Sequence, residues 1–442
     1  MRMAGIELKS QPSLSGFSSL VRYAKRPLKR FEDARSFSTR ASAYELLGTY
    51  TQVIFDPELI ESVLIGNHAA FSKDAFVRDL GAILGDGLLN SEGEHWRRQR
   101  KLAAPSFQRT EVAAYAEQMV ECSERFLRGL KEGVPFDVHA AFMHLTLDIL
   151  VRTLFGTEIS RVRDVEDALD EVMVEYSPLR MTLRVALPPW LSVLSQRRIA
   201  RLRGALDSVL LELIQARRQR EGSSTDLLSR LLAAGDAQGG FSDAQLRDET
   251  MTLFLAGHET TALVLTYTLR LLALHPSVAE RAQREVRKVL AGRSLTLADL
   301  PALTYTRAVL DESMRLFPPA WGMTREAIAD CELGEYACPA GTQVIIVPWV
   351  MHRDQRFFER PELFQPERWL TPLELPRCVY MPFGAGPRVC IGNHFALTEA
   401  MLVLASCLAQ GRFSLAQGPL LRLSPAVTLR PSGPVNMQLQ RF

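Results

Sequence analysis

The residues most suited to chemistry gather in one short segment, 383–392, which reads Phe-Gly-Ala-Gly-Pro-Arg-Val-Cys-Ile-Gly. Two glycines and a proline before Cys390 predict a tight, rigid loop whose backbone N–H groups can face the sulfur. A helical pattern follows, and the positive end of its dipole favours a thiolate over a thiol. Such a thiolate can serve as an axial ligand to heme iron. The alternative is a buried, unreactive cysteine, which is our interpretation of Cys122 and Cys407.

A second segment, 256–261, reads Ala-Gly-His-Glu-Thr-Thr and lies inside a long apolar helical pattern. Glycine beside two threonines is a poor helix centre, and the Thr260 hydroxyl can bond to the carbonyl of Ala256 and open the helix locally. The expected groove would hold this hydroxyl and the carboxylate of Glu259, which suits dioxygen binding and proton delivery. A zinc-protease helix is excluded because its H-E-x-x-H pattern needs a histidine where Ala262 stands.

Two further spacings place interacting side chains on one helix face. Glu312 and Arg315 are three residues apart and can pair, although such a pair is more often solvated. Trp96 and Arg100 are four residues apart on an early helix, so both can reach one anionic group. Three other basic residues share that helix and form either a partner-binding face or ordinary surface charge: Arg97, Arg98 and Lys101.

The elements that must position these groups are mostly helical. A strand is expected over 49–55, and Asp56-Pro57 predicts the start of a helix over 57–66. Ser242 and Gln245 form a capping box for a long apolar helix that ends near Leu274. The remaining expected elements are a helix over about 303–316, a strand over 342–347 and a final helix over about 391–409. The predicted fold class is mainly α with a small β part.

Composition narrows the class of protein. The 442 residues are 47% hydrophobic and 23% charged, with 52 basic and 50 acidic residues. This balance gives no charge-driven affinity for nucleic acid and is too apolar for a disordered chain. Six cysteines without a CxxC pair favour a reducing compartment, which we take to be the cytoplasm.

The N-terminal region shows no targeting signal. Residues 1–21 lack a continuous apolar core, so a signal peptide is not expected. The most membrane-like stretch, 251–274, carries Glu259 near its middle, which favours a buried helix over a transmembrane segment. We interpret residues 1–44 as an N-terminal arm. Its basic cluster is either solvated or touches a membrane surface or a partner: Arg22, Lys25, Arg26, Lys29 and Arg30.

Segment 383–392 matches, at every defined position, the heme-binding loop F-x-x-G-x-R-x-C-x-G of the cytochrome P-450 family. The resemblance extends from about residue 45 to the end of the chain. Segment 256–261, together with Gly-Asp-Gly-Leu-Leu over 85–89, resembles bacterial fatty-acid hydroxylases of that family. The resemblance implies the cytochrome P-450 fold, with a single heme-thiolate monooxygenase domain over 45–442.

The resemblance also implies a role for each candidate residue. Cys390 would be the axial ligand of heme b, with Phe383 in the same loop, while Glu259 and Thr260 would support proton delivery. The heme propionates would meet four side chains: Trp96, Arg100, Arg325 and Arg388. Three residues would lie above the heme beside substrate: Leu89, Ala256 and Ala320. A buried network would fix the cysteine loop, with Trp369 where the family usually has phenylalanine: Glu312, Arg315 and Arg368.

The implied reaction inserts one oxygen atom of O2 into a lipophilic substrate, with a long-chain fatty acid or a terpenoid favoured. The heme domain fills the 442 residues, so electrons from NAD(P)H should arrive through a separate ferredoxin or flavodoxin with its reductase. The alternatives are a peroxide-driven peroxygenase of the same fold and a non-enzymatic heme sensor or carrier. The pair Glu259 and Thr260 disfavours both.

Overall fold

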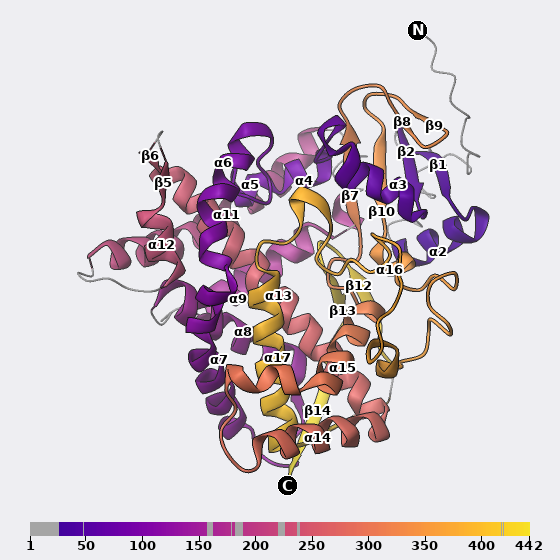
Figure 1. The fold of residues 1–442 in the computed structure, drawn as a ribbon. Coiled ribbons are helices and arrows are strands. Elements are labelled where there is room, and N and C mark those ends of the chain that lie inside the picture. The colour runs from indigo at the N-terminus through magenta and orange to yellow at the C-terminus, as the bar shows by residue number, and fades with distance from the viewer. Residues whose placement is uncertain are drawn as a thin grey trace.

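The computed structural model describes residues 26–46, 48–156, 162–177, 179–181, 189–219, 226–236, 239–416, 418 and 420–442. A large helical body carries a smaller sheet region on one side (Figure 1). The helices are α2 (Pro27–Phe37), α3 (Pro57–Glu61), α4 (Ala75–Asp79), α5 (Gly81–Leu84), α6 (Gly93–Ala103), α7 (Arg109–Gly129), α8 (Val138–Phe155), α9 (Val162–Glu175), α11 (Pro189–Gln219), α12 (Leu227–Ala233), α13 (Asp243–Leu274), α14 (Pro276–Leu290), α15 (Thr304–Leu316), α16 (Pro348–Met351) and α17 (Asn393–Gln410).

The strands are short. They are β1 (Ala41–Leu46), β2 (Thr49–Ile54), β3 (Phe71–Ser72), β4 (Phe136–Asp137), β5 (Gly235–Asp236), β6 (Gly239–Gly240), β7 (Met323–Ala327), β8 (Cys331–Leu333), β9 (Tyr336–Cys338), β10 (Gln343–Ile346), β11 (Gly411–Leu415), β12 (Leu423–Pro425), β13 (Leu429–Pro431) and β14 (Asn436–Arg441). The mainly α class with a small β part is confirmed.

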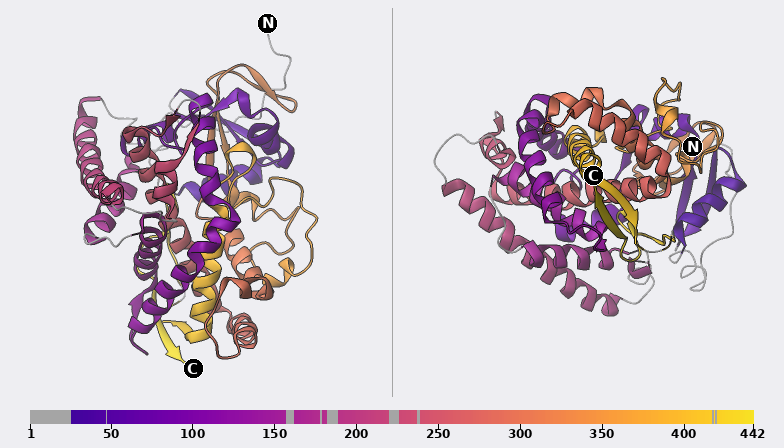
Figure 2. Two further views of the ribbon diagram at one scale, coloured as in Figure 1. Left: turned by 60° about the vertical axis from the view of Figure 1, so that its left-hand side comes forward. Right: turned by 90° about the horizontal axis from the view of Figure 1, so that it is seen from below.

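Helix α13 runs through the centre of the helical body and packs against α8, α15 and α17 (Figures 1 and 2). The capping box between Ser242 and Gln245 is confirmed at its start. Gly257 lets α8 approach closely, because a Cβ there would lie 2.6 Å from Cδ1 of Leu150. The predicted local opening of this helix is wrong. Helical structure is uninterrupted from Asp243 to Leu274, since the Thr260 hydroxyl bonds to Ala256 without displacing the backbone.

The main sheet has the strand order β1-β2-β10-β7-β3, in which β10 runs parallel to β2 and the other pairings are antiparallel. It forms a second hydrophobic core beside the helical one. The part of the predicted N-terminal arm that the structure describes belongs to this core: Phe31 and Tyr44 are buried in it, and Arg35 pairs with Asp354 at 2.9 Å. The expected extent of the arm to residue 44 is therefore corrected. Arg22 and Lys25 lie outside the described residues.

The C-terminal strands bring distant residues to the middle of α13. Strands β12 and β13 form a hairpin, and the Tyr267 hydroxyl of α13 donates to the carbonyl of Leu429 at 2.6 Å. A separate three-stranded sheet joins β11, β14 and β4. The hairpin thereby holds Thr428 and Arg430 beside α13.

Helix α13 is long but carries charged side chains along its length. In the described part of the chain, no single helix is both long and apolar enough to cross a membrane. Helices α13 and α14 pass such a test only as a pair, and they are bent by 114° at their junction.

Candidate active site

The cysteine loop is closed by its own backbone. The Cys390 N–H donates to the carbonyl of Phe383 at 2.9 Å, and the Gly384 N–H donates to Met381 at 3.0 Å. Gly386 has φ of 71°, and a Cβ there would lie 2.0 Å from the carbonyl oxygen of Leu64. Only glycine fits this close approach without moving the chain. The rigid loop expected from the sequence is therefore also packed closely against the π-helix Ser62–Gly66, which lies between β2 and β3.

The Cys390 side chain is exposed, and it lies two residues before Gly392, the N-cap of α17. Although the residue is exposed, desolvation by the protein around its sulfur raises the pKa of the thiol, while the Gly392 N–H and the Arg100 charge act in the opposite direction. The net direction differs from the expectation that the helix dipole would dominate, because loss of water disfavours the charged form more strongly. The two other cysteines interpreted as unreactive, Cys122 and Cys407, are buried, and burial raises the pKa of each to about 12.

An ion network with a fully buried centre, Glu312 and Arg315, lies at the C-terminal end of α15. Glu312 receives two bonds from Arg315, both 2.8 Å, and one from Arg368 at 3.0 Å. The structure thus brings together all three residues of the predicted network. It also explains Trp369, whose indole N–H donates to Glu312 at 2.8 Å, a bond that phenylalanine could not make. Burial raises the pKa of Glu312, but Arg315 and its other donors outweigh this effect and hold it below the usual value.

His352 connects this network to the cysteine loop and was not predicted from the sequence. Arg315 donates to the backbone carbonyl of His352 at 2.8 Å, and the His352 ring accepts from the Met381 N–H at 3.0 Å. Burial is the main reason that the pKa of His352 falls to about 3, so the ring is neutral and free to accept. Met381 in turn bonds to Gly384 of the loop. A lone histidine in an irregular stretch gave no signal for this role.

Four cations gather on the other side of the loop. The Arg388 guanidinium lies 3.9 Å from the Trp96 ring centre and donates to the Ser91 carbonyl at 2.9 Å. Burial lowers the pKa of Arg388 to about 10, with Glu92 opposing the shift and nearby Arg325 adding to it. Burial also lowers the pKa of three neighbouring basic groups: Arg100, Arg325 and Lys73. Glu92 pairs with Arg388, and an anionic ligand would neutralise the positive charge that remains in this largely half-buried cluster.

The two predicted proton-delivery residues have different partners. Thr260 is partly exposed, and its hydroxyl donates to the Ala256 carbonyl at 2.9 Å. Glu259 is 2% exposed and accepts from Thr428 and Arg430, both at 2.5 Å. Burial raises the pKa of Glu259, but the Arg430 charge and these bonds lower it overall. The carboxylate is thus held by the C-terminal hairpin, whereas the hydroxyl bonds within its own helix.

Three small or aliphatic residues are exposed within otherwise buried segments. Ala256 lies between buried residues of α13, and Ala320 follows two buried prolines. Leu89, in the loop before α6, is 38% exposed. Exposed apolar side chains in such settings are typical of residues that line a binding site. The structure therefore leaves all three predicted substrate contacts available.

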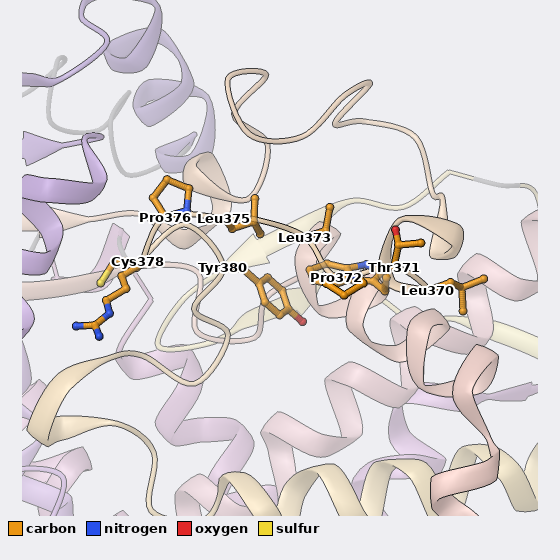
Figure 3. Close-up of a pocket in the computed structure, with 10 residues that line it drawn as sticks. Leu370, Thr371, Pro372, Leu373, Leu375, Pro376, Cys378 and Tyr380 are labelled. Atoms are coloured by element: carbon orange, nitrogen blue, oxygen red, sulfur yellow. The ribbon is translucent and has the colours of Figure 1, made fainter.

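A separate open pocket of about 570 Å³ lies on the irregular stretch before the cysteine loop. Figure 3 shows Tyr380 between Pro376 and Leu375 on one side and Leu370 and Thr371 on the other. Its lining includes none of the site residues predicted from the sequence. The candidate site is therefore built around Cys390 and α13.

The predicted basic face on α6 is partly occupied by contacts within the protein. Arg97 pairs with Glu94, and Arg98 donates to the Gly239 carbonyl at 2.8 Å. Lys101 is exposed. Lys101 is therefore the better of these residues for a test of partner binding.

Comparison with known proteins identifies the family. A family model described as cytochrome P-450 matches residues 10–437. The chain belongs to the cytochrome P-450 family. Cyclooctatin synthase from Streptomyces melanosporofaciens is 36% identical over 391 residues, which is 86% of this chain and 84% of that protein. Cyclooctat-9-en-7-ol 5-monooxygenase from the same organism is 34% identical, over 80% and 78%. Pentalenene oxygenase from Streptomyces avermitilis is 33% identical, over 80% of each chain.

As a cytochrome P-450, the protein is an oxidoreductase that incorporates oxygen, and its family holds heme iron through a thiolate. The residues present fit this group. The exposed Cys390 offers a sulfur donor. The half-buried cation cluster around Arg388 would be stabilised by the two negative charges that heme propionates carry. Exposed Ala256 and Ala320 supply small surfaces of the kind that a flat macrocycle and a substrate require.

Proposed function

We propose that this cytochrome P-450 hydroxylates or epoxidises a terpenoid, with Cys390 as the axial ligand of heme b. The observation that carries this proposal is the exposed Cys390 in a loop closed by its own backbone and flanked by a cluster of half-buried cations. When bound, the heme would supply dioxygen activation. Four side chains would hold its propionates: Trp96, Arg100, Arg325 and Arg388. Phe383 would support the loop through its carbonyl bond to Cys390.

The roles proposed for α13 follow from the partners of its side chains. The Thr260 hydroxyl, partly exposed beside Ala256, would organise water next to bound dioxygen. Glu259 would pass protons only after it exchanges the Arg430 bond for water, because its carboxylate is held by that guanidinium. The carboxylate thus needs a local movement to act, whereas the hydroxyl does not.

A terpenoid is favoured over a fatty acid for two reasons. The similar proteins include pentalenene oxygenase and cyclooctat-9-en-7-ol 5-monooxygenase, which are named for a hydrocarbon and an alcohol. The proposed substrate contacts Leu89, Ala256 and Ala320 are themselves apolar, which suits a hydrocarbon skeleton.

We propose that electrons come from NAD(P)H through a separate ferredoxin or flavodoxin with its reductase. Exposed Lys101 on α6 suits an acidic partner of this kind. We also propose a cytoplasmic setting, because all six cysteines are unpaired thiols and disulfides are rare where thiols are kept reduced.

The heme assignment is tested with purified protein and its Cys390→Ala variant. The reduced carbon monoxide complex should show the red-shifted Soret band of thiolate ligation, and the variant should lose it. Cys407→Ala is the matched control, because that thiol is buried on α17 away from the loop. Retention of the band in Cys390→Ala would overturn the ligand assignment.

The substrate class is tested by adding a cyclic diterpene alcohol, a sesquiterpene hydrocarbon and palmitic acid to the ferric holoenzyme. A terpenoid should shift the heme from low to high spin at lower concentration than palmitic acid does. Product formation should require NAD(P)H, ferredoxin and reductase. A shift with palmitic acid alone would overturn the terpenoid assignment, and turnover with hydrogen peroxide alone would favour a peroxygenase.

A further inference from the structure

Lys73, just after β3, makes an unusual set of contacts. Its side chain is buried, and its Nζ donates to the carbonyl of Leu89 while lying 3.4 Å from the carbonyls of Leu88 and Ser91. An ammonium has three donors and no acceptor, so three backbone carbonyls match it. Lys73 therefore holds the loop before α6 through main-chain atoms.

Glu249 of α13 holds the same loop from the other side. This side chain is 1% exposed, and its Oε2 accepts from the Leu88 N–H at 3.1 Å. The neighbouring Asp248 accepts from the Asp86 N–H at 2.8 Å. Leu88 is thus bound through its N–H by a carboxylate, while its carbonyl faces an ammonium.

The loop lies directly against α13. A Cβ on Gly87 would come within 2.4 Å of the Thr252 hydroxyl and 2.5 Å of the Asp248 carbonyl. Glu249 is seven residues before Ala256, so both lie on one face of the helix. Glu249, which binds the loop, and Ala256, the proposed substrate contact, are therefore two turns apart on the same face of α13.

Lys73 and Glu249, together called the clamp, hold a loop in which two adjacent leucines differ in exposure. Leu88 is 8% exposed and packs inward, whereas Leu89 is 38% exposed. Burial is the main reason that the pKa of Lys73 falls to about 7 and that of Glu249 rises to about 7. Two buried ionisable groups are a costly way to fasten a loop, so a purely structural purpose would be served better by apolar side chains.

We propose that Lys73 and Glu249 are specificity-determining positioning residues, which fix the Leu88 backbone so that the Leu89 side chain forms one wall of the substrate pocket. This inference rests on the proposed substrate contact of Leu89. Neither residue touches the reacting atoms. Their effect is to set how much space an elongated or branched apolar substrate finds beside α13.

The test uses the holoenzyme with two probes whose nitrogen coordinates heme iron: imidazole and N-dodecylimidazole. The first needs little space, and the second needs the apolar pocket. Lys73→Met and Glu249→Met should each raise the Kd of N-dodecylimidazole on the order of tenfold, and leave that of imidazole within about twofold. Lys73→Arg and Glu249→Gln, which keep a donor and an acceptor, should restore binding of the long probe.

Two further measurements separate the clamp from the pocket. Backbone hydrogen exchange over residues 85–91 should accelerate roughly tenfold or more in Lys73→Met and Glu249→Met. Leu89→Ala should weaken N-dodecylimidazole binding while exchange stays slow, because the clamp is intact. If Leu89→Ala leaves binding unchanged, the proposed substrate contact itself fails.

Three outcomes would overturn the clamp proposal while the proposed function stands. One is unchanged exchange over 85–91 in Lys73→Met and Glu249→Met. Another is faster exchange with unchanged N-dodecylimidazole binding. The third is an equal loss for both probes, which would assign Lys73 to the heme rather than to the pocket.

Discussion

Two regions of this cytochrome P-450 each bury a glutamate near cations, but the two carboxylates have different hydrogen-bond partners and opposite pKa shifts. Glu312 accepts from Arg315, Arg368 and Trp369, and its pKa lies below the usual value. Glu249 has one oxygen bonded to Leu88 and one without a hydrogen-bond partner, and burial raises its pKa to about 7. The difference arises because guanidiniums bond directly to Glu312, whereas Lys73 bonds to carbonyls. Direct pairing gives a fixed charge, and its absence leaves a titratable group.

The largest expected effect comes from breaking the fixed network. Glu312→Ala leaves Arg315 buried and unpaired, which should cost about 3–5 kcal/mol of unfolding free energy and yield little heme-loaded protein. Glu367→Ala, in the short helix that follows Gln365, is the control: it removes a surface ion pair with Arg281 and a bond from the Tyr305 hydroxyl, and should cost less, about 1–2 kcal/mol. Heme content and chemical unfolding measure both. Normal heme content and stability in Glu312→Ala would remove the structural role.

The second prediction concerns α13, where a substitution should alter the reaction while the stability of the protein stays the same. Thr260→Ala should fold, bind heme and accept electrons, yet release more hydrogen peroxide and less product per NAD(P)H. Proton assistance of this kind is worth roughly 10²–10⁴-fold in rate, so coupling should fall sharply. Thr268→Ala removes the same type of helix bond, to Val264, elsewhere on α13 and should stay coupled. Equal coupling in wild type and Thr260→Ala would leave the hydroxyl with a backbone role only.

The third test uses pH to compare the two regions. Glu249, raised to about 7, binds a proton in the folded state between pH 4.5 and 7 that the unfolded chain has lost, so stability falls as pH rises through that range. Lys73, lowered to about 7, has lost its proton between pH 7 and 10.5 while the unfolded chain keeps it, so stability rises there. The contribution of these two groups to the free energy of unfolding should therefore be smallest near pH 7.

Unfolding midpoints measured from pH 5 to 9 test the direction of these two contributions to stability. The stability of wild type minus that of the double variant Lys73→Met with Glu249→Gln should pass through a minimum near pH 7, because the difference removes the contribution of other titrating groups such as His352. The Glu312 network should contribute no change over this range, because its carboxylate stays ionised. A wild-type curve parallel to that of the double variant would contradict the assigned pKa directions.

The smallest expected effect concerns the surface of α6. Lys101→Glu should slow reduction by an acidic ferredoxin several-fold at low salt, and the effect should shrink at high salt because the steering charge is screened. Lys288→Glu on α14, which lies at the opposite end of the molecule (Figure 1), is the control. Equal reduction rates for wild type and Lys101→Glu at low ionic strength would place the docking site elsewhere.

Much of the framework was predictable because local signals decide it. The capping box at Ser242, the strand before Asp56 and the long C-terminal helix all follow from short-range preferences of the chain. The described part of the arm packs into the sheet core through contacts with remote residues, such as Arg35 with Asp354, and no local pattern specifies such partners. Residues 57–66 form a helix as expected, but its second half is a π-helix.

Local sequence was enough to single out the candidate site residues: the loop around Cys390, the threonine of α13 and, for a structural role, the E-x-x-R pair of α15. Their types and spacings have few other uses, and the family match agrees with them. The hydrogen-bond partners of these residues could be read from the folded structure alone. Glu259 faces Arg430, His352 links Arg315 to the loop, and Lys73 meets the loop before α6. Burial and distance between remote segments set these contacts and their pKa values, and neither quantity is written in local sequence.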